Sequence, residues 1–128
     1  MKQRFIVLIV WTLILLGLLL IPSADELIPR TCGGFEHWDK VAHFGLFGVT
    51  GLVGVFGTSF LRQFKSRILF GIAFGLFLAV STEFAQSLIP ARNMSLYDLL
   101  ADVAGLCVAF ALCVLLYRRP LFARLFSL

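Results

Sequence analysis

The chain has 128 residues, of which 60% are hydrophobic and 14% are charged. This composition excludes an ordinary water-soluble domain, because a domain of this length cannot bury so much apolar surface. The net charge of +4 does not indicate a nucleic-acid partner either, since the basic residues stand in short clusters between apolar runs and form no continuous basic stripe. The composition therefore predicts an integral membrane protein.

Four apolar runs are close to the length that crosses a bilayer as a helix. We predict an all-α fold with one transmembrane domain over residues 1–128, a polytopic four-helix bundle with helices at about 5–21, 41–60, 68–89 and 98–117. The first run follows Lys2 and Arg4, as in a signal peptide. It is longer than the apolar core of such peptides, so we expect a retained helix.

The second run carries a regular row of small residues, namely Gly45, Gly48, Gly51, Gly54 and Gly57. Within a bilayer, small side chains let helix backbones approach closely, so this row predicts a helix-packing surface. Thr50 in the same run can bond back to its own helix through its hydroxyl group.

The third and fourth runs each carry a stripe of small residues that ends in carboxylates. The stripes consist of Gly71, Gly75, Ala79 and Glu83, and of Asp98, Asp102, Gly105 and Ala109. Spacings of three and four residues place each stripe on one helix face, so we expect the carboxylates to face other helices and not lipid. Ser95 followed by Asp98 resembles the capping box that begins a helix.

The charged residues predict an orientation with both termini in the cytoplasm. Most basic residues then lie inside, namely Lys2, Arg4, Arg62, Lys65, Arg67, Arg118, Arg119 and Arg124, and the others lie outside, namely Arg30, Lys40 and Arg92. This bias follows the positive-inside rule. Every acidic residue then falls on the outer half, namely Asp25, Glu26, Glu36, Asp39, Glu83, Asp98 and Asp102.

Three polar clusters interrupt the apolar runs near their outer ends. They are Asp39, Lys40 and His43, then Glu83 and Gln86, then Asp98 and Asp102, with Arg92 in the loop before the last pair. The helical rise places all three at a similar depth, near the outer headgroup boundary. Ionisable groups within a membrane indicate a functional site. We therefore predict that the clusters meet in one ligand-binding pocket that opens to the outer face.

Several kinds of chemistry fit these residues. An imidazole with a carboxylate one turn away is the arrangement of a tuned base, so an acid–base enzyme would use His43 as base and Glu83 or Asp98 as acid. A headgroup site would use Lys40 and Arg92 for phosphate, and the acids and the amide for hydroxyl groups and amines. Alternatively, the polar side chains only hold the helices together.

The sequence predicts no cofactor. One histidine with two or three carboxylates would suit Zn²⁺, Mn²⁺ or Mg²⁺, so a divalent metal stays an open alternative, but no established metal-binding spacing is present. The cysteines Cys32, Cys107 and Cys113 form neither a disulfide framework nor a metal motif. The apolar cytoplasmic halves of the helices argue against a proton or ion path.

The order and spacing of the polar motifs resemble the VanZ-like family of small membrane proteins. The resemblance covers roughly residues 35–109 and rests on Asp39-Lys40-x-x-His43-Phe44, Glu83-x-x-Gln86, Arg92, Asp98 and a small-residue helix with Gly105. Members of the family are multi-helix bacterial membrane proteins, and the namesake is associated with teicoplanin resistance. The family has no established catalytic residues, so the resemblance implies only a shared site at these motif positions.

One residue departs from the family pattern, which often has asparagine where this chain has Asp102. An ionised Asp102 would add a second negative charge one turn below Asp98, so the ligand need not be that of the namesake.

These features predict a multi-pass protein of the bacterial cytoplasmic (inner) membrane. Its outward pocket would act on or shield a cell-envelope component, such as a lipid-linked precursor or a phospholipid headgroup, and contribute to glycopeptide (teicoplanin) tolerance. The alternatives are a membrane-embedded hydrolase or transferase for a lipid-linked phosphate or sugar, and a structural or partner-binding membrane subunit. The oligomeric state stays open.

Overall fold

The computed structural model describes residues 2–20, 38–90, 94–117, 119 and 120. These residues form four α-helices and no β-strand. The helices are α1 (Lys2–Leu20), α3 (Trp38–Gly57), α4 (Phe64–Ser87) and α5 (Leu96–Leu116). The predicted all-α fold is therefore confirmed for the described part of the chain, and each helix is long and apolar enough to cross a membrane.

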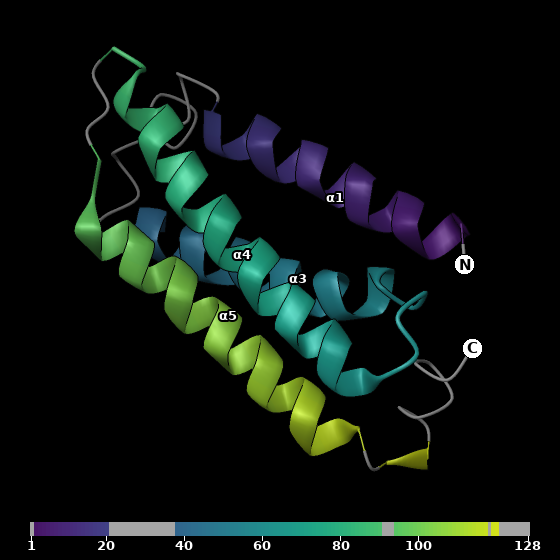
Figure 1. The fold of residues 1–128 in the computed structure, drawn as a ribbon. Helices are drawn as coiled ribbons and strands as arrows, with labels where there is room; N and C mark the ends of the chain where they lie inside the picture. The colour runs from purple at the N-terminus through teal and green to yellow at the C-terminus, as the bar shows by residue number, and fades with distance from the viewer. Residues whose placement is uncertain (1, 21–37, 91–93, 118, 121–128) are drawn as a thin grey trace.

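Helix α3 is the centre of the arrangement, because it contacts α1, α4 and α5. Its most extensive contact is with α5, and α4 packs against both α1 and α5. The four helices lie lengthwise beside one another (Figure 1). Two aromatic pairs, Phe5 with Phe60 and Phe64 with Tyr117, place the α3–α4 connection at the end of the bundle where α1 begins and α5 ends.

The contact between α3 and α5 depends on residues without large side chains. Gly105 of α5 lies directly against the backbone carbonyl of Phe44 in α3, where no Cβ atom fits. A Cβ atom on Gly51 would come within 2.7 Å of the Cβ atom of Ala109. The predicted packing role of these small residues is confirmed. Gly45 is different, because no described atom lies within 4 Å of the position its Cβ would take, apart from its chain neighbours and the nearby backbone of its own helix.

The two stripes of small residues on α4 and α5 are buried, as their spacing predicts. The buried members are Gly71, Gly75, Ala79 and Glu83 on α4, and Asp98, Asp102, Gly105 and Ala109 on α5. The carboxylates on these stripes consequently lie inside the bundle.

Each helix begins a few residues before the apolar run from which it was predicted. Helix α3 begins at Trp38, so Asp39 and Lys40 lie in its first turn and not in a preceding loop. A first helical turn accepts polar residues because its N–H groups lack intrahelical acceptors, and a negative side chain interacts favourably with the helix dipole. Asp39 and His43 therefore belong to the same helix.

Two hydrogen bonds attach α1 to the rest of the bundle. Trp11 Nε1 donates to Thr50 Oγ1 at 2.9 Å, and Thr50 Oγ1 donates in turn to the carbonyl of Leu46 at 2.8 Å, as predicted for this hydroxyl group. Trp11 lies in the middle of α1; near the C-terminal end of the helix, Gln86 Nε2 donates to the carbonyl of Leu19 at 3.0 Å. Helix α1 is thus held at two depths, by α3 and by α4.

The outward-facing surface of the helices is apolar. Leu13 of α1, Phe77 of α4 and Leu115 of α5 are 64%, 67% and 70% exposed, and many other large hydrophobic side chains also point outward. Such a surface is unfavourable in water and suits contact with lipid.

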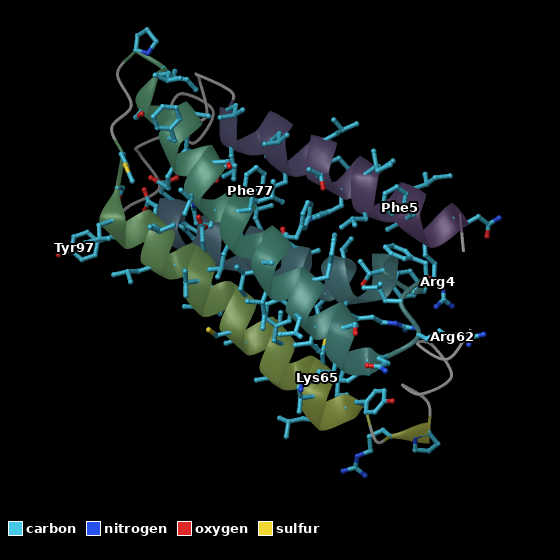
Figure 2. The ribbon with its side chains drawn as sticks, in the orientation of Figure 1. Arg4, Phe5, Arg62, Lys65, Phe77 and Tyr97 are labelled. Carbon is cyan, nitrogen blue, oxygen red and sulfur yellow. The ribbon has the colours of Figure 1, made fainter. Side chains whose placement is uncertain are left out.

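Charged side chains gather at the two ends of the bundle. Arg4 and Lys65 lie toward one end and Tyr97 toward the other (Figure 2). The buried Arg67 belongs to the basic end, where its Nε donates to the carbonyl of Leu61 at 2.7 Å. The carboxylates near the other end are Asp39, Glu83, Asp98 and Asp102. Other charged residues used to predict the orientation lie outside the described residues, namely Asp25, Glu26, Arg30, Glu36, Arg92, Arg118 and Arg124, as does the Lys2 side chain.

Candidate functional site

The site begins in the first two turns of α3. Asp39 and His43 are four residues apart and lie over one helix face, with Asp39 Oδ1 4.0 Å from His43 Nε2. The His43 side chain is 1% exposed, whereas that of Asp39 is 49% exposed. The imidazole therefore lies inside the bundle, and the Asp39 carboxylate lies at the surface, one helical turn before it.

Helix α5 supplies a second carboxylate to the same imidazole. His43 Nδ1 donates to Asp102 Oδ1 at 2.9 Å, and both side chains are buried. The close approach of the two backbones at Gly105, about one turn farther along α5, brings Asp102 within reach of His43. An ionised Asp102 favours the proton on Nδ1, and in a neutral imidazole Nε2 then keeps its lone pair for another partner.

Helix α4 contributes Glu83, which is fully buried. Glu83 Oε2 accepts a hydrogen bond from the backbone N–H of Ser95 at 2.9 Å. Ser95 caps α5, as predicted, because its Oγ accepts from the N–H of Asp98 at 3.3 Å. In a complete capping box the side chain at the Asp98 position would return a bond to the Ser95 N–H. Here Glu83 from another helix occupies that N–H group.

The Asp98 side chain instead faces α3. Lys40 Nζ lies 3.6 Å from Asp98 Oδ1, and the Lys40 side chain is 36% exposed. This distance is too long for a hydrogen bond, and a partly exposed ion pair of this kind stabilises a protein by only about 0–1 kcal/mol. Lys40 is therefore a weakly held partner for Asp98.

Four buried polar atoms of this region accept or donate no hydrogen bond among the described residues. They are His43 Nε2, Glu83 Oε1, Asp98 Oδ1 and Asp102 Oδ2. Buried polar atoms almost always have a partner, because each unsatisfied one costs about 1–3 kcal/mol. One imidazole among several carboxylates can transfer protons or bind a cation.

Possible metal ligands in this region form two overlapping sets. One set is Asp39, His43 and Asp98, and the other is His43, Glu83 and Asp102. Within each set the candidate ligand atoms lie within 4.8 Å of one another. His43 belongs to both sets and therefore links the exposed Asp39 to the buried Glu83 and Asp102.

The structure brings most of the predicted site residues together. We call these residues the polar cluster: Asp39, Lys40, His43, Glu83, Asp98 and Asp102. Gln86 instead donates to the carbonyl of Leu19 in α1, and Arg92 lies outside the described residues. The bond from the Ser95 N–H to Glu83 was not predicted from the sequence. The capping motif at Ser95 marks an N–H group that needs an acceptor, but it does not show that the acceptor comes from another helix.

Comparison with known proteins gives a similarity that covers part of the chain. Over 85 residues the chain is 35% identical to the uncharacterized protein C11E3.10 of Schizosaccharomyces pombe. The match covers 65% of this chain and 51% of that relative, so the chain spans about half of the relative's length. No family model and no solved structure matches the chain.

Proposed function

We propose that the protein is a multi-pass, VanZ-like membrane protein whose polar cluster binds the polar head of a lipid or of a lipid-linked envelope component. The observation that supports this most strongly is the set of four unsatisfied polar atoms inside an otherwise apolar bundle. If the cluster served only to hold helices together, these atoms would be paired with one another, as His43 Nδ1 and Asp102 Oδ1 are. Unpaired atoms favour a bound ligand.

The proposed location is the cytoplasmic (inner) membrane of a bacterium, with both termini in the cytoplasm. The support is the separation of charge, because Arg4, Lys65 and Arg67 lie at the end opposite the polar cluster. Positive residues favour the cytoplasmic side, so the polar cluster would face outward. At that depth it would meet the headgroups of the outer leaflet.

The charges of the polar cluster narrow the class of ligand. Its four carboxylates outnumber Lys40 and His43, so it favours a group that carries amines or hydroxyls over a bare phosphate. If a headgroup carries both amines or hydroxyls and a phosphate, the carboxylates would bind the amines or hydroxyls and Lys40 would bind the phosphate.

Tolerance to teicoplanin is the cellular test of this proposal. We expect expression of the wild-type chain in a susceptible bacterium to raise the minimal inhibitory concentration. His43→Ala, Glu83→Ala and Asp98→Ala should each return it to the vector value at equal protein level. Gln63→Ala, at an exposed position between α3 and α4, is the control and should retain the effect. Tolerance that persists in all three cluster variants, or no effect of the wild type, would contradict the proposal.

The hydrogen bond between His43 and Asp102 favours a second candidate, a membrane-embedded hydrolase or transferase. In this candidate Asp102 orients His43 as the general base, and Glu83 or Asp98 is the acid for a lipid-linked phosphate or sugar. Purified protein incubated with polyprenyl diphosphate or phospholipid, with and without divalent metal, would then release a product detectable by mass spectrometry. If no product forms but lipid is still bound, only the binding function is retained.

A purely structural role gives a third pattern of results. His43→Ala would then lower the melting temperature of the purified protein and leave lipid binding unchanged.

A further inference from the structure

The polar cluster contains the donor groups of a divalent-cation site. Glu83 uses Oε2 for the Ser95 N–H and leaves Oε1 unsatisfied, and Asp102 uses Oδ1 for His43 and leaves Oδ2 unsatisfied. Asp98 Oδ1 and His43 Nε2 also have no hydrogen-bond partner among the described residues. The oxygen atoms carry lone pairs that a cation could accept, as does Nε2 of a neutral His43.

We propose that the polar cluster binds a divalent transition-metal ion, Zn²⁺ or Mn²⁺, through His43 Nε2 and the carboxylates of Asp39 and Asp98. These three residues form the outer of the two sets of candidate ligands. The inner carboxylates, Glu83 and Asp102, add negative charge behind the imidazole.

The hydrogen bond to Asp102 prepares His43 for this role. Histidines that bind metals usually donate their second ring nitrogen to a carboxylate or carbonyl, which fixes the tautomer and the orientation of the ring. His43 Nδ1 makes this bond at 2.9 Å inside the bundle, so the metal ligand is Nε2. Nε2 points toward the Asp39 carboxylate, with Asp39 Oδ1 4.0 Å away.

The distances within the outer set suit a site that closes around its ion by rotation of side chains. Ligand atoms that each lie 2.0–2.2 Å from one metal ion are about 3.4 Å apart in a tetrahedral site. The candidate atoms lie within 4.8 Å of one another, and Nε2 is 4.0 Å from Asp39 Oδ1. Movements of up to about 1 Å by the Asp39 and Asp98 side chains would therefore complete the site. The half-exposed Asp39 provides a path for the ion from the outer solution.

Lys40 is the group that competes with a cation, because its ammonium lies 3.6 Å from Asp98 Oδ1. It makes no hydrogen bond to that oxygen at this distance, and its long flexible side chain can turn outward. A divalent ion would neutralise more of the negative charge of Asp39, Glu83, Asp98 and Asp102 than one lysine can.

The mixed donor set indicates the class of metal. Imidazole suits zinc and other transition metals, whereas carboxylates alone suit Mg²⁺ and Ca²⁺. One imidazole with two carboxylates therefore favours Zn²⁺ or Mn²⁺ over Ca²⁺.

The proposed role of the ion in lipid binding rests on the proposed function, whereas the binding of the ion itself does not. An acidic cluster repels phosphate, but the same cluster with a bound divalent ion attracts it. The ion would therefore let the pocket hold the phosphate of a lipid headgroup, beside Lys40.

Titration of the purified protein with the metal alone tests the inference. The protein, prepared without a histidine tag and treated with EDTA, is titrated with ZnCl₂ or MnCl₂ by calorimetry, and bound metal is measured by mass spectrometry. We expect one ion per chain and a higher melting temperature with metal. Asp98→Asn keeps the size of the side chain and the backbone cap of α5. It should weaken metal binding at least about ten-fold, because substitution of residues that merely support metal ligands already has an effect of this size. Asp39→Asn should act in the same direction.

Two control variants separate this site from other possible ligands. Cys107→Ala removes an exposed thiol from α5, and His37→Ala removes the other histidine of the chain. Both should bind the metal as the wild type does. No metal binding, or equal metal binding by wild type and Asp98→Asn, would overturn the inference. It would also be overturned if the purified protein retained phosphatidylethanolamine and bound no metal. Metal binding without lipid binding would contradict only the proposed function, and lipid binding without metal binding would contradict only this inference.

Discussion

His43 is the residue on which the polar cluster depends. Its imidazole lies between the carboxylates of Asp102 and Asp39, and its side chain is almost completely buried. In such an apolar interior a lost hydrogen bond leaves a polar group with no water to replace it. The effect of a substitution at Asp102 should therefore depend on whether the new side chain still accepts a bond from His43 Nδ1.

We expect Asp102→Ala to lower the free energy of unfolding by about 1–3 kcal/mol, because it leaves the buried His43 Nδ1–H without an acceptor. Asp102→Asn should lose much less stability, since the amide oxygen of asparagine can accept the same bond. The measurement is the unfolding of purified protein in mixed micelles at increasing fractions of denaturing detergent. Equal losses in both variants would mean that the charge of Asp102, and not its hydrogen bond, stabilises the bundle.

Some partners of individual residues could be predicted from the sequence and others could not. The approach of Asp39 to His43 follows from their spacing on one helix, and the approach of Asp102 follows from its depth. Gln86 shares a helix end with Glu83, yet its amide reaches the Leu19 carbonyl instead. Spacing shows which residues share a face of one helix, but it does not show which neighbouring helix that face meets.

At the scale of the elements, the crossing of α3 and α5 determines the geometry of the site. The small residues that allow this crossing were recognisable in the sequence, because they recur every three or four residues along each helix. Their partners were not, since α3, α4 and α5 all carry rows of small residues. Gly51 meets Ala109 and Gly54 meets Gly71, so one helix presents glycines to two neighbours.

Gly105→Ala should separate α3 from α5 next to the polar cluster. The added methyl group would collide with the Phe44 carbonyl, and relief of such overpacking typically costs about 1–3 kcal/mol. The same displacement would move Asp102 away from His43, so Zn²⁺ affinity should fall together with stability. Both are measured on purified protein, by detergent unfolding and by calorimetry.

Gly45→Ala is the matched control for this substitution. It adds the same methyl group to α3 where no described atom lies within 4 Å, so stability should stay equal or rise slightly with the better helix propensity of alanine. If Gly45→Ala and Gly105→Ala destabilise the protein equally, close packing at Gly105 is not the cause.

At the scale of the whole molecule, composition and apolar run length were sufficient to predict four helices and the absence of strands in the described residues. A chain with this much apolar surface must satisfy its backbone groups within helices if it enters lipid. The order of packing around α3 was not predictable, because the outer faces of all four helices are similarly apolar. Basic side chains lie at one end of the bundle and acidic side chains at the other, and this separation predicts the orientation of the bundle in the membrane.

The orientation can be tested at two exposed positions on opposite ends of the bundle. In a background in which Cys32, Cys107 and Cys113 are replaced by alanine, Gln63→Cys lies in the α3–α4 connection and Met94→Cys lies just before α5. Because basic residues favour the cytoplasmic side, a membrane-impermeant maleimide should label Met94→Cys in intact cells and Gln63→Cys only after permeabilisation. The reverse pattern would mean that the polar cluster faces the cytoplasm. Labelling of both positions in intact cells would exclude a bundle that spans the membrane between them.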